Sequence, residues 1–112
     1  MKLLTIITLF LLTVSCYDID RQFKHIVNTW QLEELGGESY PEIHQWCFKK
    51  DGTFFFADGS EISEDFNYTI SETELCLLVS DTECFDLLEL TKKSLIVKRR
   101  DVQVDYKFKA LN

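Results

Sequence analysis

From Asn28 onward, short segments rich in β-forming residues recur about every 8–12 residues. Turn-forming pairs such as Gly36-Gly37, Asp51-Gly52 and Asp58-Gly59 separate most of them. This spacing is typical of an all-β sandwich or barrel. The eight segments that we predict as strands are Thr29–Leu35, Ile43–Lys49, Thr53–Ala57, Glu64–Ile70, Glu74–Val79, Cys84–Leu90, Ser94–Arg99 and Val102–Lys109.

Apolar and polar residues alternate along several of these strands. In the segment Glu64–Ile70, every second residue from Phe66 onward is apolar or aromatic, and the same alternation runs from Val102 to Phe108. Each strand therefore has one buried face and one solvated face. This pattern predicts an antiparallel sheet curled around a single core.

The Asp51-Gly52 turn allows two registers for its hairpin. A three-residue loop with a left-handed Gly52 places four aromatic residues on one face, whereas a two-residue loop divides them between both faces. We predict the three-residue loop, which leaves Cys47 opposite Phe55 on the outer face. The four aromatic residues are Trp46, Phe48, Phe54 and Phe56.

The first sixteen residues have the pattern of an export signal: Lys2, the apolar run Leu3–Leu12 and small residues up to Ser15. The run is shorter than the roughly 20 apolar residues of a membrane-spanning helix. Because Cys16 directly follows Ser15, the segment resembles a bacterial lipoprotein signal, in which this Cys is acylated and becomes the first mature residue. Thr13 stands where such signals prefer Leu. The alternative is an ordinary secretory signal that leaves Cys16 for a disulfide.

The chain accordingly divides into a signal peptide at residues 1–15, a lipidated Cys with a tether and a short helix at residues 16–27, and one β domain at residues 28–112. The helix is expected between Asp20 and Val27, with Phe23 and Ile26 on one face. We expect an exported protein of the cell envelope that a lipid anchors to a membrane. The resemblance to lipoprotein signals favours the outer membrane.

The cysteine pairing depends on Cys16. If Cys16 is lipidated, three cysteines remain and at most one disulfide forms, whereas a free Cys16 allows two. Cys76 and Cys84 flank a turn and face outward, so an odd-length loop sets them opposite each other. We predict a Cys76–Cys84 disulfide with Cys47 free. The alternative is three reduced thiols.

The charge balance is strongly acidic, with 19 acidic and 12 basic residues in the full chain. This excess argues against nucleic acid as a partner, because phosphates would be repelled. We expect a monomer.

The sequence contains no catalytic constellation and no Gly-rich phosphate loop. Neither His25 nor His44 stands at metal-ligand spacing from other ligands. We therefore predict no enzyme activity, no cofactor and no metal, and we interpret His44, on the inward face of Trp46, as a structural residue.

The aromatic residues are the one candidate functional feature. They either line a cavity for an apolar ligand or fill the core. Because so short a chain needs its core for stability, we expect a filled interior. The nine candidates are Trp30, Trp46, Phe48, Phe54, Phe56, Phe66, Tyr68, Tyr106 and Phe108.

Three ordered segments resemble the lipocalin-like domains of Bacteroidota lipoproteins: Trp-x-Leu within Val27–Leu32, Phe-x-x-Asp-Gly-Thr-aromatic at Phe48–Phe54, and the stretch Phe85–Thr91 that precedes a short strand. Asn28 departs from the family's usual Gly. The resemblance implies a small antiparallel up-and-down barrel of about eight strands. Trp30–Leu35 also resembles the opening of META-type domains, whose Cys-Asn signature is missing.

This resemblance implies a membrane-anchored lipoprotein that holds a small hydrophobic ligand inside the barrel. The alternative function is a solid barrel that binds an envelope protein or glycan through its outer surface. An interior void above about 300 Å³, open at one end, favours the ligand carrier. A filled interior with an exposed apolar patch favours the interaction module.

Overall fold

The computed structural model describes residues 21–112. Cys16, the predicted signal peptide and the predicted tether lie outside these residues. No helix within the described range is long and apolar enough to cross a membrane. The elements are the 3-10 helix η1 (Arg21–Ile26) and the strands β1 (Thr29–Leu35), β2 (Glu38–Ser39), β3 (His44–Phe48), β4 (Thr53–Asp58), β5 (Glu61–Ile62), β6 (Phe66–Ile70), β7 (Glu74–Leu78), β8 (Thr82–Leu90), β9 (Ser94–Arg99) and β10 (Val104–Ala110).

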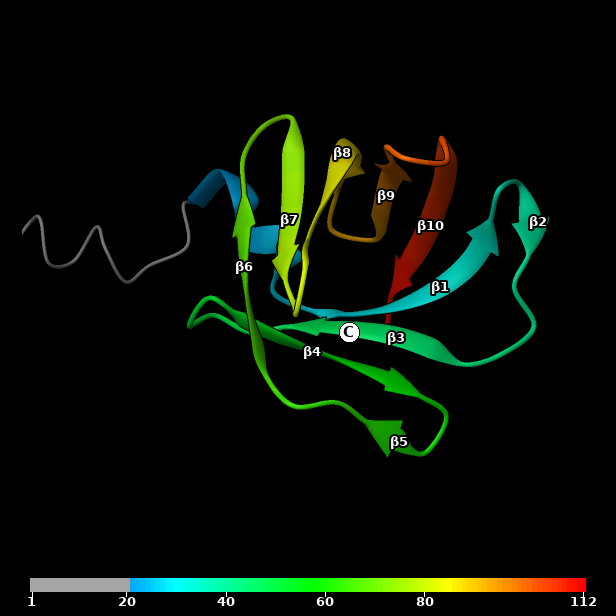
Figure 1. Ribbon diagram of the computed structural model, residues 1–112, viewed down its shortest axis with the longest axis horizontal. Helices are drawn as coiled ribbons and strands as arrows, with labels where there is room; N and C mark the ends of the chain where they lie inside the picture. The colour runs from blue at the N-terminus through cyan, green and yellow to red at the C-terminus, as the bar shows by residue number, and fades with distance from the viewer. Residues whose placement is uncertain (1–20) are drawn as a thin grey trace, which may run out of the picture.

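Eight of the strands close into an antiparallel barrel (Figure 1). Their order is β1-β3-β4-β6-β7-β8-β9-β10, and β10 returns to pair with β1. The two-residue strands β2 and β5 extend β1 and β4. Closure gives each barrel strand a partner on both sides, which removes the exposed edges of an open sheet. The prediction of an all-β barrel with a short N-terminal helical turn is confirmed.

The β3–β4 hairpin has the register that the aromatic pattern predicts. Phe48 pairs with Phe54, and Trp46 pairs with Phe56. Gly52 has a φ of +89°, which glycine adopts without the steric cost of a side chain. All four rings therefore face the interior.

The outer face of the barrel carries the cysteines of the described residues. Cys47 lies opposite Phe55 and is free. The Nζ atom of Lys49 lies 5.7 Å from the centroid of the Phe55 ring, so a cation covers this outward aromatic. Cys76 pairs with Cys84 across β7 and β8, and a disulfide joins them.

The helix η1 closes one end of the barrel. In a 3-10 helix, residues three apart lie on one face, and both Phe23 and Ile26 are buried, Ile26 completely. The indole Nε1 of Trp30 donates to the carbonyl oxygen of Ile26 at 2.9 Å. η1 contacts β8, and Phe23 borders a surface pocket together with Leu87 and Leu90 of that strand. This end of the interior is therefore filled.

Three strands, β6, β8 and β10, begin two residues away from the predicted start, and the other boundaries agree to within one residue. β10 begins at Val104, and Val102 is 56% exposed in the preceding turn, where Gln103 has a φ of +54°. The alternation of Val102 with the following residues thus continues into a turn rather than a strand. In contrast, β8 begins at Thr82, two residues before the predicted start. This earlier start adds Glu83 to the strand.

Candidate functional site

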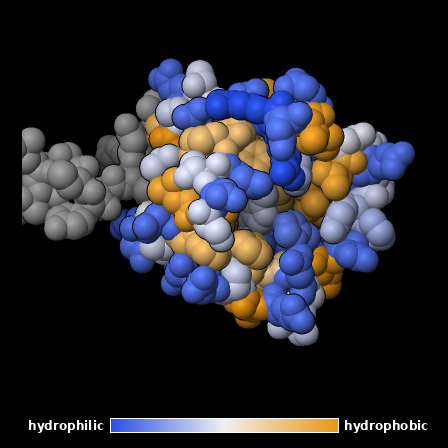
Figure 2. All heavy atoms as spheres, viewed as in Figure 1, coloured by the Kyte–Doolittle hydropathy of each residue, from blue (hydrophilic) through white to orange (hydrophobic). Residues whose placement is uncertain are grey.

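The end of the barrel opposite η1 is open and contains a cleft of about 410 Å³. The strands β3, β6, β8 and β10 begin near this end, whereas β4 and β7 end there. Figure 2 shows hydrophobic residues reaching the surface between hydrophilic ones on the face seen in Figure 1. The cleft is lined by His44, Trp46, Phe54, Phe56, Phe66, Leu77, Val79, Ser80, Glu83, Phe85 and Tyr106.

The nine predicted aromatic residues comprise five that line the cleft and four that do not, and Trp46 and Phe54 of the cleft also belong to the buried core. Five of them line the cleft: Trp46, Phe54, Phe56, Phe66 and Tyr106. The other four are at most 5% exposed and belong to the core: Trp30, Phe48, Tyr68 and Phe108. The expectation of a filled interior therefore holds only for the end that η1 closes.

Three aromatic rings from separate strands form a contiguous wall of the cleft. The ring centroids of Trp46 and Phe85 lie 5.5 Å apart, and those of Phe85 and Tyr106 lie 5.6 Å apart, both edge to face. The centroids of Trp46 and Tyr106 are 6.0 Å apart. Such contacts fix the orientation of the rings. We call Trp46, Phe85 and Tyr106 the aromatic wall.

A hydrogen-bonded chain holds Trp46 in place. The indole Nε1 of Trp46 donates to Nε2 of His44 at 3.0 Å. Because an indole N–H can only donate, Nε2 must carry a lone pair, and the imidazole proton sits on Nδ1. Nδ1 hydrogen-bonds Asp58, which pairs with His44 across β3 and β4. The His44 ring is therefore held between Trp46 and Asp58.

Ser80 also lines the cleft, which brings a serine, a histidine and an aspartate to one region. In a catalytic triad, the histidine accepts the serine proton on its free ring nitrogen. Here Nε2 of His44 already accepts the indole N–H of Trp46. The chain His44–Asp58 therefore positions Trp46 and does not activate Ser80.

Glu83 supplies the one carboxylate among the described residues that line the cleft. Its side chain is 44% exposed, and Oε1 accepts a hydrogen bond from Nη2 of Arg99 at 3.3 Å. The Nε atom of Arg99 donates to Asp101 at 2.9 Å. Hydrogen bonds with Tyr106 and Asp101, together with the charges of Glu83 and Asp101, raise the pKa of Arg99. The guanidinium of Arg99 thus hydrogen-bonds the carboxylates of both Glu83 and Asp101.

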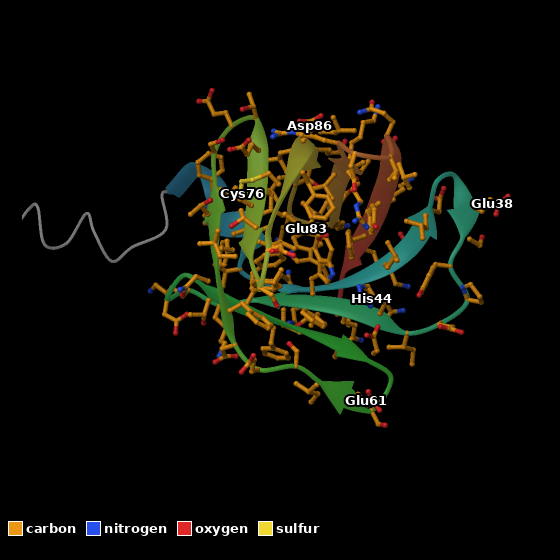
Figure 3. All side chains as sticks on the ribbon, in the orientation of Figure 1. Glu38, His44, Glu61, Cys76, Glu83 and Asp86 are labelled. Atoms are coloured by element: carbon orange, nitrogen blue, oxygen red, sulfur yellow. A yellow bond between two sulfur atoms is a disulfide. The ribbon has the colours of Figure 1, made fainter. Side chains whose placement is uncertain are left out.

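Figure 3 labels Glu83 on β8 and His44 on β3, two of the polar residues that line the cleft, from strands that lie across the barrel from each other. The sequence prediction missed Glu83 because the strand was started at Cys84. Extending the inward alternation of Leu87 and Phe85 by one step would have found it. In the same way, the predicted pairing of Trp46 with Phe56 extends to His44 and Asp58.

The described residues contain one group with the chemistry of a metal site: Glu74, Cys76 and Cys84. Zinc and similar ions need cysteine as thiolate. Both sulfur atoms are bonded to each other. In the oxidised protein this group therefore lacks thiolate ligands.

No protein-family model, curated protein or solved structure shows significant similarity to this chain.

Proposed function

We propose that this protein is a lipocalin-like carrier that binds a small hydrophobic molecule in the cleft at the open end of its barrel. The observation that carries the proposal is the volume of about 410 Å³, lined mainly by aromatic and aliphatic side chains. Small-molecule sites commonly occupy about 300–1,000 Å³ and combine an apolar lining with a few polar groups.

The rigidity of the lining also supports binding. The rings of Phe56 and Phe66 stack with centroids 5.9 Å apart, and the aromatic wall is held through Trp46 by His44. A ligand that enters such a preformed cleft orders few side chains, so little of the binding free energy is spent on immobilising them.

The alternative, an interaction module acting through the outer surface, has less support. The exposed large hydrophobic residues each come from a different segment, so no single strand of the described residues presents an apolar face. They are Ile43, Ile62, Leu78, Leu88, Val102 and Leu111.

The proposal is tested with the neutral apolar dye N-phenylnaphthylamine, whose emission rises when it leaves water. In Val79→Trp, a bulky ring enters the cleft from β7's end; in the control Leu78→Trp, the same ring is added at the neighbouring outward position. We expect wild type and Leu78→Trp to bind the dye and Val79→Trp to lose binding. Equal binding by all three proteins, with cooperative unfolding of each, would contradict a site in the cleft. Absence of binding to wild type would also contradict it.

We further propose that Cys16 carries a lipid anchor that holds the barrel at an envelope membrane. The support is the sequence pattern ahead of Cys16. The test is Cys16→Ser in the native host. We expect the variant to leave the membrane fraction and to lack the mass of the acyl chains. A variant that stays in the membrane fraction would show that the anchor is not at Cys16.

A further inference from the structure

We propose that the ligand of this cleft is a cationic amphiphile: an apolar body with an alkylammonium head that binds between Glu83 and the aromatic wall. This inference rests on the proposed function, because it specifies the chemistry of the molecule held in the same cleft. Three features of the open end support it: the charge of the lining, the placement of the aromatic rings, and the unequal contacts of Arg99 with Asp101 and Glu83.

The lining itself is anionic. Glu83 contributes a carboxylate, and the described residues of the lining include no lysine or arginine. His44 uses Nε2 to accept the indole N–H of Trp46 and directs Nδ1 to Asp58. Its partner Asp58 adds a second carboxylate, 60% exposed, beside the lining. A cationic head is therefore attracted here, and an anionic head is repelled.

Arg99 does not cancel this charge. Its Nε lies 2.9 Å from Asp101 and its Nη2 lies 3.3 Å from Glu83, so two carboxylates share one guanidinium, which also hydrogen-bonds Tyr106. The shorter contact, to Asp101, stays in place if Glu83 turns toward a ligand. Among the described residues, only Oε1 of Glu83 has a hydrogen-bond donor, which leaves Oε2 able to accept from an ammonium group.

The aromatic wall provides the second element of ammonium recognition. Phe85 lies two residues from Glu83 on β8, and its ring contacts both Trp46 and Tyr106. Aromatic faces attract alkylammonium groups through the ring quadrupole, and this attraction grows when water is displaced. Phe54, Phe56 and Phe66 of the same lining offer apolar surface for the body of the molecule.

The test compares three ligands with one eight-carbon chain and different heads: octylamine, octanol and octanoate. Isothermal titration calorimetry at neutral pH measures the dissociation constant of each for wild type, Glu83→Gln and the control Glu38→Gln. Glu38 lies on β2, outside the lining, and carries the same change in charge. We expect wild type and Glu38→Gln to bind octylamine most tightly and octanoate most weakly. Glu83→Gln should weaken the binding of octylamine about fivefold, the effect expected of a partly exposed charge pair. The binding of octanol should stay unchanged.

The possible results distinguish failure of the cationic-head inference from failure of the proposed function on which it rests. Equal affinity for octylamine and octanol in wild type, or tightest binding of octanoate, overturns the cationic head and leaves the cleft as a binding site. Preference for octylamine that survives in Glu83→Gln overturns the role of Glu83. Unchanged octanol binding shows that the variant is folded. If none of the three ligands binds to wild type, the proposed function fails and this inference fails with it.

Discussion

The closure of the barrel by η1 leads to a quantitative prediction for Ile26→Ala. Ile26 is fully buried in the core, and the substitution removes three carbon atoms. At about 0.8 kcal/mol per buried methylene, the lost transfer free energy is about 2.4 kcal/mol. The hydrogen-bonded wall of a closed barrel cannot collapse fully onto the gap, which adds a cavity cost. We expect the free energy of unfolding to fall by about 3 kcal/mol.

Urea denaturation followed by tryptophan fluorescence measures this loss. Leu88→Ala is the matched control, because Leu88 is 52% exposed at the β8 bulge and its truncation should change the unfolding free energy by less than about 1 kcal/mol. Ligand binding by Ile26→Ala should be unchanged, since the cleft lies at the other end. A loss below about 1 kcal/mol for Ile26→Ala would show that η1 does not seal the core.

Three further predictions concern pH and redox state. Burial, and then the charge of Asp51, raise the pKa of Tyr68 to about 12 from 10.0. The resulting stability is present below pH 10 and lost as the pH rises through about 12. The free energy of unfolding of Tyr68→Phe should therefore lack this fall at high pH. Hydrogen bonds from the side chain and backbone of Thr53 lower the pKa of Asp51 below 3.8. The stability that this shift contributes is present above pH 3.8 and lost as the pH falls through the folded-state pKa. Acid unfolding of Asp51→Asn should lack this loss of stability. Opening the Cys76–Cys84 disulfide, which spans 8 residues, by Cys76→Ala with Cys84→Ala should cost about 2 kcal/mol in urea. An unchanged pH dependence of stability in Tyr68→Phe or Asp51→Asn, or an unchanged urea midpoint in the double cysteine variant, would contradict the corresponding assignment.

Most of the barrel could be predicted because alternation with a period of two reports burial directly. It located the strands, and the requirement that aromatic side chains share a face selected the β3–β4 register. The opposition of Cys76 and Cys84 followed from the same counting. Val102 shows the limit, since a turn can continue the alternation by chance.

The cleft could not be predicted from the sequence. Whether an eight-stranded barrel is solid or hollow depends on how side chains from all its strands fill the interior, and here the two ends differ. Trp30 is buried and hydrogen-bonded to Ile26 of η1, whereas Trp46 and Tyr106 line an opening. The inward alternation gives no information about which end a residue occupies until the barrel is closed.

The two tryptophans allow the most direct test of a cleft at one end of a closed barrel. The indole N–H of Trp30 is hydrogen-bonded to Ile26 at the sealed end, and that of Trp46 is bonded to His44 at the open end. Each gives its own signal in a ¹H–¹⁵N correlation spectrum. On addition of octylamine, we expect the Trp46 signal to shift in a saturable manner and the Trp30 signal to remain in place. Equal shifts of both signals, or a shift of Trp30 alone, would contradict the account.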